Sequence, residues 1–114
     1  MSAPPAVRVE LLWWSGCPSA DGAIELVREE MGAAGIDPDR LEIREMTTEA
    51  QALDESFVGS PTIRVDGVDL QTPSEEPAGL TCRVYRRRDG RVSPLPDRGD
   101  VRDALERALE GGAR

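Results

Sequence analysis

The sequence contains no histidine, no lysine and no asparagine among its 114 residues, so all 14 basic residues are arginine. Without histidine, the chain cannot form a Ser-His or Cys-His nucleophile pair or offer an imidazole ligand to a metal. Without lysine, it has no P-loop lysine and forms no Schiff base. The groups that remain for chemistry are two cysteines and 22 acidic residues.

Long apolar segments are absent as well. No stretch approaches the roughly 20 apolar residues of a membrane span, and residues 1–6 do not resemble a signal peptide. The net charge of −8 argues against binding to nucleic acid or to an anionic membrane surface. We therefore expect a cytoplasmic protein with neither kind of partner. In a reducing compartment, two cysteines are more often reactive, metal-binding or buried than permanently crosslinked.

The hydrophobic pattern predicts alternating strands and helices within a single domain, 1–114. Strands are expected at 7–14 and 41–46, each followed by a helix, at 20–34 and 47–54. Two hairpins follow, at 62–70 and from 81–87 to Val92, each turning at Asp-Gly. A last helix, which Asp100 is expected to cap, ends at Gly111. This order predicts an α/β fold, a mixed central sheet with its first strands parallel and flanked by helices on both faces.

Cys17 follows the first predicted strand, in the loop Ser15-Gly16-Cys17-Pro18, where the first helix is expected to begin. Ligands of such sheets bind at the carboxyl ends of the strands. A thiol at a helix N-terminus faces unpaired N–H groups and the positive end of the helix dipole, which lower its pKa. An inert, buried cysteine is the alternative. We expect Trp14 to supply an apolar surface beside the Cys17 thiol; the alternative is that Trp14 is a second core tryptophan.

Three motifs together resemble the thioredoxin-like superfamily. They are Gly16-Cys17-Pro18, Phe57-Val58-Gly59-Ser60-Pro61-Thr62-Ile63 and Cys82-Arg83-Val84-Tyr85. The resemblance extends over nearly the whole chain and includes small bacterial thioredoxin-like proteins, some labelled alkylmercury lyase-like. It implies a thioredoxin-like fold in which Pro61 is cis and packs against Cys17. It also implies that the backbone at Ser60 pairs with the extended chain of a substrate.

The sequence departs from thioredoxins at the second active-site thiol, because Ala20 stands at the position of their resolving cysteine. Three chemistries stay open for Cys17. It could form a mixed disulfide that a small thiol resolves, pair with Cys82, or share a soft metal such as mercury or copper(I) with Cys82. Cys82 shares a strand face with Val84, so a buried hydrophobic cysteine is an equal alternative there.

The leading hypothesis is a thiol-disulfide oxidoreductase or thiol-reactive protein, with Cys17 as the nucleophile and Cys82 or an external thiol as the resolver. Its partner would be a thiol or disulfide, either a protein or a small molecule, and it would use no cofactor and no resident metal. Substrate contacts are expected from Trp14, Ser15, Pro18, Ser60, Pro61 and Thr62. The alternative is a non-catalytic binding module that keeps the thioredoxin fold.

Five arginines lie close together near the end of the chain, at positions 83, 86, 87, 88 and 91. Consecutive residues of a strand point to opposite faces of a sheet. We therefore interpret the cluster as a solvated strand edge in preference to an anion site.

Overall fold

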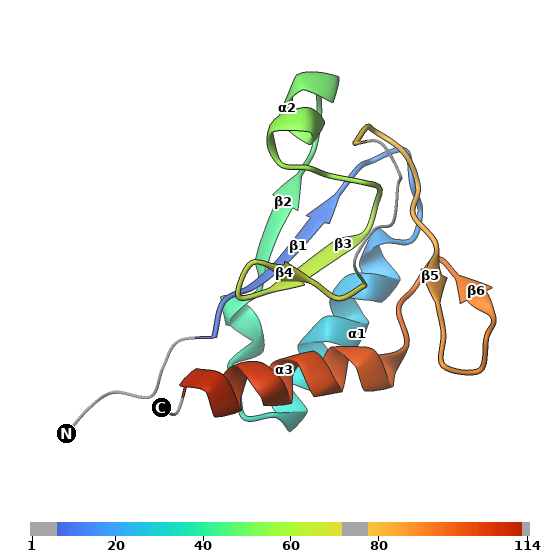
Figure 1. Ribbon diagram of the computed structural model, residues 1–114. Coiled ribbons are helices and arrows are strands. Elements are labelled where there is room, and N and C mark those ends of the chain that lie inside the picture. The colour runs from blue at the N-terminus through green and yellow to red at the C-terminus, as the bar shows by residue number, and fades with distance from the viewer. Residues whose placement is uncertain (1–6, 72–77, 113–114) are drawn as a thin grey trace.

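The computed structural model describes residues 7–71 and 78–112 (Figure 1). A short 3-10 turn, Pro38–Arg40, follows the first helix. The strands and helices are β1 (Val9–Trp13), α1 (Ala20–Ala33), β2 (Glu42–Glu45), α2 (Glu49–Asp54), β3 (Thr62–Val65), β4 (Val68–Asp69), β5 (Tyr85–Arg86), β6 (Val92–Ser93) and α3 (Arg98–Gly112). Among the described residues, no helix is long and apolar enough to cross a membrane.

Four strands form a mixed sheet in the order β2-β1-β3-β4. β1 runs parallel to β2, with Leu11 opposite Ile43, and antiparallel to β3, with Leu11 opposite Ile63. β3 turns into β4 at Asp66 and Gly67, whose φ angles of 51° and 82° are those of a tight hairpin turn. The predicted mixed sheet, with its first two strands parallel and helices flanking it, is confirmed.

α1 and α3 cover the same face of this sheet (Figure 1). In α1, the buried residues that face the sheet recur every four positions, as one face of a helix requires. Glu30 of α1 is buried where α1 meets α3, and it accepts hydrogen bonds from Arg98 at 2.9 Å and Arg102 at 3.0 Å. The main core on this face includes Val9, Leu11, Ala23, Val27, Met31, Ile63, Val65, Val101 and Leu105.

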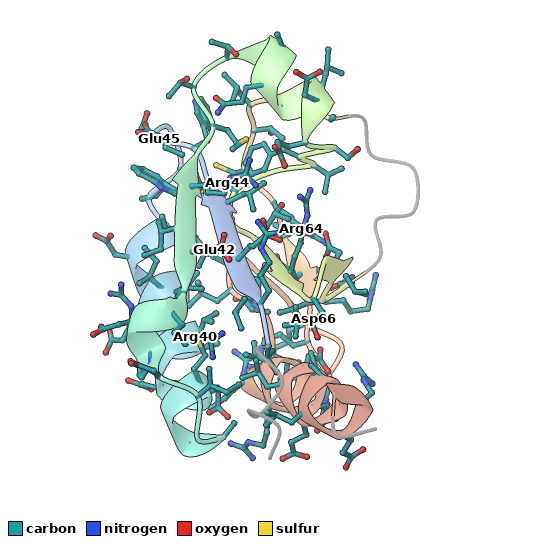
Figure 2. All side chains as sticks on the ribbon, turned by 90° about the vertical axis from the view of Figure 1, so that its left-hand side faces the viewer. Arg40, Glu42, Arg44, Glu45, Arg64 and Asp66 are labelled. Atoms are coloured by element: carbon teal, nitrogen blue, oxygen red, sulfur yellow. The ribbon has the colours of Figure 1, made fainter. Side chains whose placement is uncertain are left out.

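The opposite face of the sheet carries ion pairs. Glu10 of β1 is buried there and pairs with Arg44 of β2 at 3.1 Å. Figure 2 shows Arg44, Glu42 and Arg64 together on the side of the strands away from α1. The short helix α2 covers only the end of this face, through a small cluster made of Leu12, Met46, Ala52 and Phe57. Helices therefore flank both faces, as predicted, but very unequally.

Two sequence predictions at the C-terminal end are wrong in detail. The expected strand at 81–87 is regular only at Tyr85–Arg86, because the residues before it leave the hairpin and pair with Ser60 instead. The carboxylate of Asp97, and not that of Asp100, caps α3 by accepting the Gly99 N–H at 2.9 Å. Asp100 instead forms an ion pair with Arg88 at 2.8 Å.

Candidate functional site

Cys17 lies in a tight turn between β1 and α1. Its N–H donates to the Trp14 carbonyl at 3.1 Å. The Trp14 ring lies directly over Gly16, where a Cβ atom would come within 2.3 Å of it, so only glycine allows this approach. α1 begins at Ala20 with Ser19 as its N-cap residue. The thiol is therefore at the carboxyl end of β1 and just before the helix, close to the predicted position.

The turn before β3 lies against this thiol. The Ser60–Pro61 peptide bond is cis, as the resemblance implied, and the Cys17 thiol lies 3.5 Å from the Ser60 carbonyl oxygen as a hydrogen-bond donor. Two buried hydroxyls hold the turn: Thr62 donates to the Gly59 carbonyl and Tyr85 to the Pro61 carbonyl, both at 2.6 Å. Thr62 therefore has a structural partner inside the protein.

The segment that carries Cys82 pairs through its backbone with the cis turn at Ser60. The Ser60 N–H donates to the Thr81 carbonyl at 2.8 Å, and the Arg83 N–H donates to the Ser60 carbonyl at 2.9 Å. These bonds make a parallel bridge between Ser60 and Cys82. The bridge places the segment of Cys82 beside the turn of Cys17, and each cysteine shifts the pKa of the other. The structure therefore brings the two cysteines together as neighbours, both of them free.

The two thiols differ in exposure. Cys17 is only 4% exposed, whereas Cys82 is exposed. Its strand neighbour Val84 is 63% exposed, so the alternative of a buried hydrophobic Cys82 is wrong. An external reagent meets the Cys82 sulfur first.

The polar groups around Cys17 favour its thiolate. Burial opposes ionisation, but hydrogen bonds from the Cys82 thiol, from the N–H and hydroxyl of Ser19 and from the Ser60 hydroxyl outweigh it and lower the pKa of Cys17. The contact with Cys17 raises the pKa of Cys82, and partial burial adds to the rise. The buried Cys17 sulfur is therefore favoured over the Cys82 sulfur as the first of the two to ionise.

The Ser60 hydroxyl beside this thiol is an unsatisfied polar group. It is fully buried and has no hydrogen-bond partner among the described residues. A buried hydroxyl without a partner is costly. An ionised Cys17 sulfur, whose pKa this hydroxyl lowers, would offer it an acceptor.

Arg83 fixes the segment that carries Cys82. It is only 8% exposed and forms two hydrogen bonds to the Asp69 carboxylate, at 2.8 and 2.9 Å. Its guanidinium lies over the Tyr85 ring, 4.4 Å from the centroid. At Gly59, with a φ of 137°, a Cβ atom would come within 2.8 Å of the Arg83 side chain. We name this arrangement of Gly59, Asp69, Arg83 and Tyr85 the arginine clamp.

The arginine clamp corrects the interpretation of the arginine cluster as a solvated edge. That interpretation holds for the exposed members of the cluster at 86, 87, 88 and 91, and it is wrong for Arg83, which is buried. Sequence reasoning also missed Asp69. The signal that pointed toward the clamp was the motif Cys82-Arg83-Val84-Tyr85, whose alternate residues Arg83 and Tyr85 face inward.

The remaining predicted contact residues surround the turn of Cys17. Ser15 and Pro18 are exposed on either side of the buried cysteine. Trp14 is half-buried and packs against the cluster at the end of α2, so it contributes to this core as well as covering Gly16. Pro61 is buried within the turn that faces the thiols.

No group of three or more Cys, Asp or Glu side chains that could hold a metal ion occurs within residues 7–71 and 78–112. Comparison of the chain with protein-family models, with curated proteins and with solved structures finds no match. The role of the site is therefore inferred from its own geometry.

Proposed function

We propose that the protein is a thiol-disulfide oxidoreductase of thioredoxin-like fold, with Cys17 and Cys82 as its redox pair. The observation that carries this proposal is the backbone bridge between Ser60 and Cys82, which sets one thiol beside the other. The cis peptide bond before Pro61, beside Cys17, supports the fold assignment.

The arrangement of the pair suits thiol-disulfide exchange. The thiolate is the attacking form of cysteine, and the pKa of Cys17 is lowered toward the range where that form is present at neutral pH. Because the fold holds both sulfurs at one place, the second exchange step takes place within the molecule and gains from proximity. The oxidised state has one new bond between the Cys17 and Cys82 sulfurs.

A second candidate function is the binding of a soft metal ion. Two neighbouring thiols match the linear two-sulfur coordination that copper(I) and mercury(II) accept. This function would need both sulfurs and no change in their oxidation state.

Oxidation of the reduced protein tests the proposed function. After incubation with glutathione disulfide, acid quenching and peptide mapping, we expect one intramolecular Cys17–Cys82 disulfide in otherwise folded protein. Cys17→Ser and Cys82→Ser variants should each fail to form it. Thiols that stay reduced, or that crosslink only between molecules, would contradict the redox role. Retention of one copper(I) ion per chain against a thiol competitor, lost in either variant, would then favour the soft-metal role.

A further inference from the structure

We infer that the site exchanges with low-molecular-weight disulfides in preference to extended polypeptides, and that these enter at Cys82. This inference rests on the proposed function and names its substrate class. It corrects the expectation that Ser60 offers a free backbone edge to a substrate chain.

The backbone of Ser60 is already paired within the chain. An extended peptide that adds to a strand edge needs free N–H and C=O groups on that edge. The Ser60 N–H already donates to Thr81, and its carbonyl already accepts the Arg83 N–H. The chain's own segment, 81–83, therefore lies where a substrate strand would pair. A polypeptide could use this edge only by displacing that segment.

The arginine clamp holds segment 81–83 in place. Its displacement would separate Arg83 from Asp69 and remove the guanidinium from the Tyr85 ring. Breaking a buried ion pair leaves a charge without its partner, which is strongly unfavourable. The arginine clamp therefore keeps the pairing edge occupied.

The two cysteines differ in their access to solvent. Attack on a disulfide needs the attacking sulfur to approach in line with the S–S bond. Cys17 is 4% exposed, whereas Cys82 is exposed. A small disulfide needs no backbone edge and can approach the Cys82 sulfur from solvent.

Oxidation of the protein by glutathione disulfide takes place in two exchange reactions. The Cys82 thiol gives its proton to solvent, and the Cys82 thiolate attacks one glutathione sulfur. A Cys82–glutathione disulfide forms, and the first glutathione leaves as a thiolate that is protonated by solvent. Cys17 then loses its proton, and its thiolate attacks the Cys82 sulfur and expels the second glutathione. Two protein thiols are oxidised, and one glutathione disulfide is reduced to two glutathione thiols.

The test compares two probes on the reduced wild-type protein: glutathione disulfide and a short extended peptide dimerised through a central disulfide. We expect oxidation by glutathione disulfide to be about tenfold faster or more, which corresponds to about 1.4 kcal/mol in activation free energy. Asp69→Asn and Arg83→Gln loosen the arginine clamp. Each should accelerate oxidation by the peptide and so lower the ratio of the glutathione disulfide rate to the peptide rate. Arg44→Gln, which removes an ion pair of Glu10 on the other sheet face, should leave the ratio unchanged.

The outcomes separate this inference from the function on which it rests. Equal rates for both probes in the wild-type protein would overturn the inference and leave the redox role intact. Failure of both probes to oxidise the pair would overturn the redox role itself. In the Cys17→Ser variant, glutathione should accumulate as a mixed disulfide on Cys82. Faster trapping on Cys17 in Cys82→Ser would overturn the assignment of Cys82 as the entry thiol.

Discussion

The Cys17 thiol donates to the carbonyl oxygen of Ser60 at 3.5 Å, and the same oxygen accepts the Arg83 N–H at 2.9 Å. One carbonyl therefore joins the segments of both cysteines. When Cys17 ionises it can no longer donate to this oxygen, and the donors that remain around it are the Cys82 thiol, the Ser19 groups and the Ser60 hydroxyl. The carbonyl keeps its bond to Arg83, so the bridge does not depend on the charge of Cys17.

Replacement of Ser60 by alanine tests the role of its hydroxyl. Ser60→Ala should raise the pKa of Cys17, because the thiolate loses one donor. It should cost little unfolding free energy while Cys17 is protonated, because the hydroxyl has no hydrogen-bond partner among the described residues. Thr62→Val is the matched control. It removes a buried hydroxyl that bonds the Gly59 carbonyl, so it should cost about 1–3 kcal/mol and leave the pKa of Cys17 in place.

Two glycine substitutions test the packing beside the thiol. Gly16→Ala should destabilise the protein by about 1–3 kcal/mol, because a Cβ atom would lie 2.3 Å from the Trp14 ring. Gly32→Ala in α1 should instead stabilise it by about 0.5–1 kcal/mol, because its Cβ meets nothing closer than 3.7 Å and alanine favours the helix. Urea unfolding measures both effects. Equal effects of the two substitutions would contradict the tight contact at Gly16.

Tyr85 is predicted to hold the cis turn through its hydroxyl. Tyr85→Phe leaves the Pro61 carbonyl without this donor and should cost about 1–3 kcal/mol in urea unfolding. Burial raises the pKa of Tyr85 far above its ordinary value, so the phenol should not ionise before the protein unfolds in alkali. Ionisation of Tyr85 in the folded protein, seen as phenolate absorbance before loss of structure, would contradict its buried position.

Glu30 should control the acid stability of the α1–α3 contact. Its hydrogen bonds with Arg102 and Arg98 outweigh burial and hold the pKa of Glu30 below its ordinary value of 4.5. Because the unfolded chain binds the proton first as pH falls, the stabilisation is present above pH 4.5 and is lost as pH falls through the lower, folded-state pKa. Glu30→Gln should therefore cost about 1–3 kcal/mol at neutral pH and flatten the acid limb of unfolding.

Glu29 provides the control for Glu30. It is half-exposed and pairs with Arg98 at 3.0 Å. An exposed pair is screened by solvent, so Glu29→Gln should change the unfolding free energy by less than about 1 kcal/mol at any pH. Equal losses in the two variants would contradict the special role of the buried carboxylate.

The sequence predicted the sheet and the position of Cys17 because these depend on local patterns. Alternation of apolar residues marks β1, four-residue spacing marks the buried face of α1, and Asp66-Gly67 marks the hairpin turn. A thiol that follows the first strand must then lie at the carboxyl end of the sheet. These features need no knowledge of distant contacts.

The position of Cys82 could not be predicted in the same way. Its strand pattern suggested a regular hairpin, but its backbone pairs with Ser60 instead, through contacts between residues far apart in the chain. The partner of Arg83 is likewise a distant carboxylate, on β4. Charge clustering in the sequence favoured solvent for all five arginines, and only the fold separates the buried one from the others.

The pKa of Cys17 in the presence and absence of its partner thiol decides whether the two cysteines form one site. The pH dependence of the cysteine Cβ chemical shifts, measured by NMR on reduced, isotope-labelled protein, reports each thiol without any need for reagent access. Wild-type Cys17 should titrate below the ordinary range for cysteine, and Cys82→Ala should raise its pKa by removing the leading donor. A Cys17 pKa that is ordinary or raised in the wild-type protein, or unchanged in Cys82→Ala, would contradict a shared thiol site.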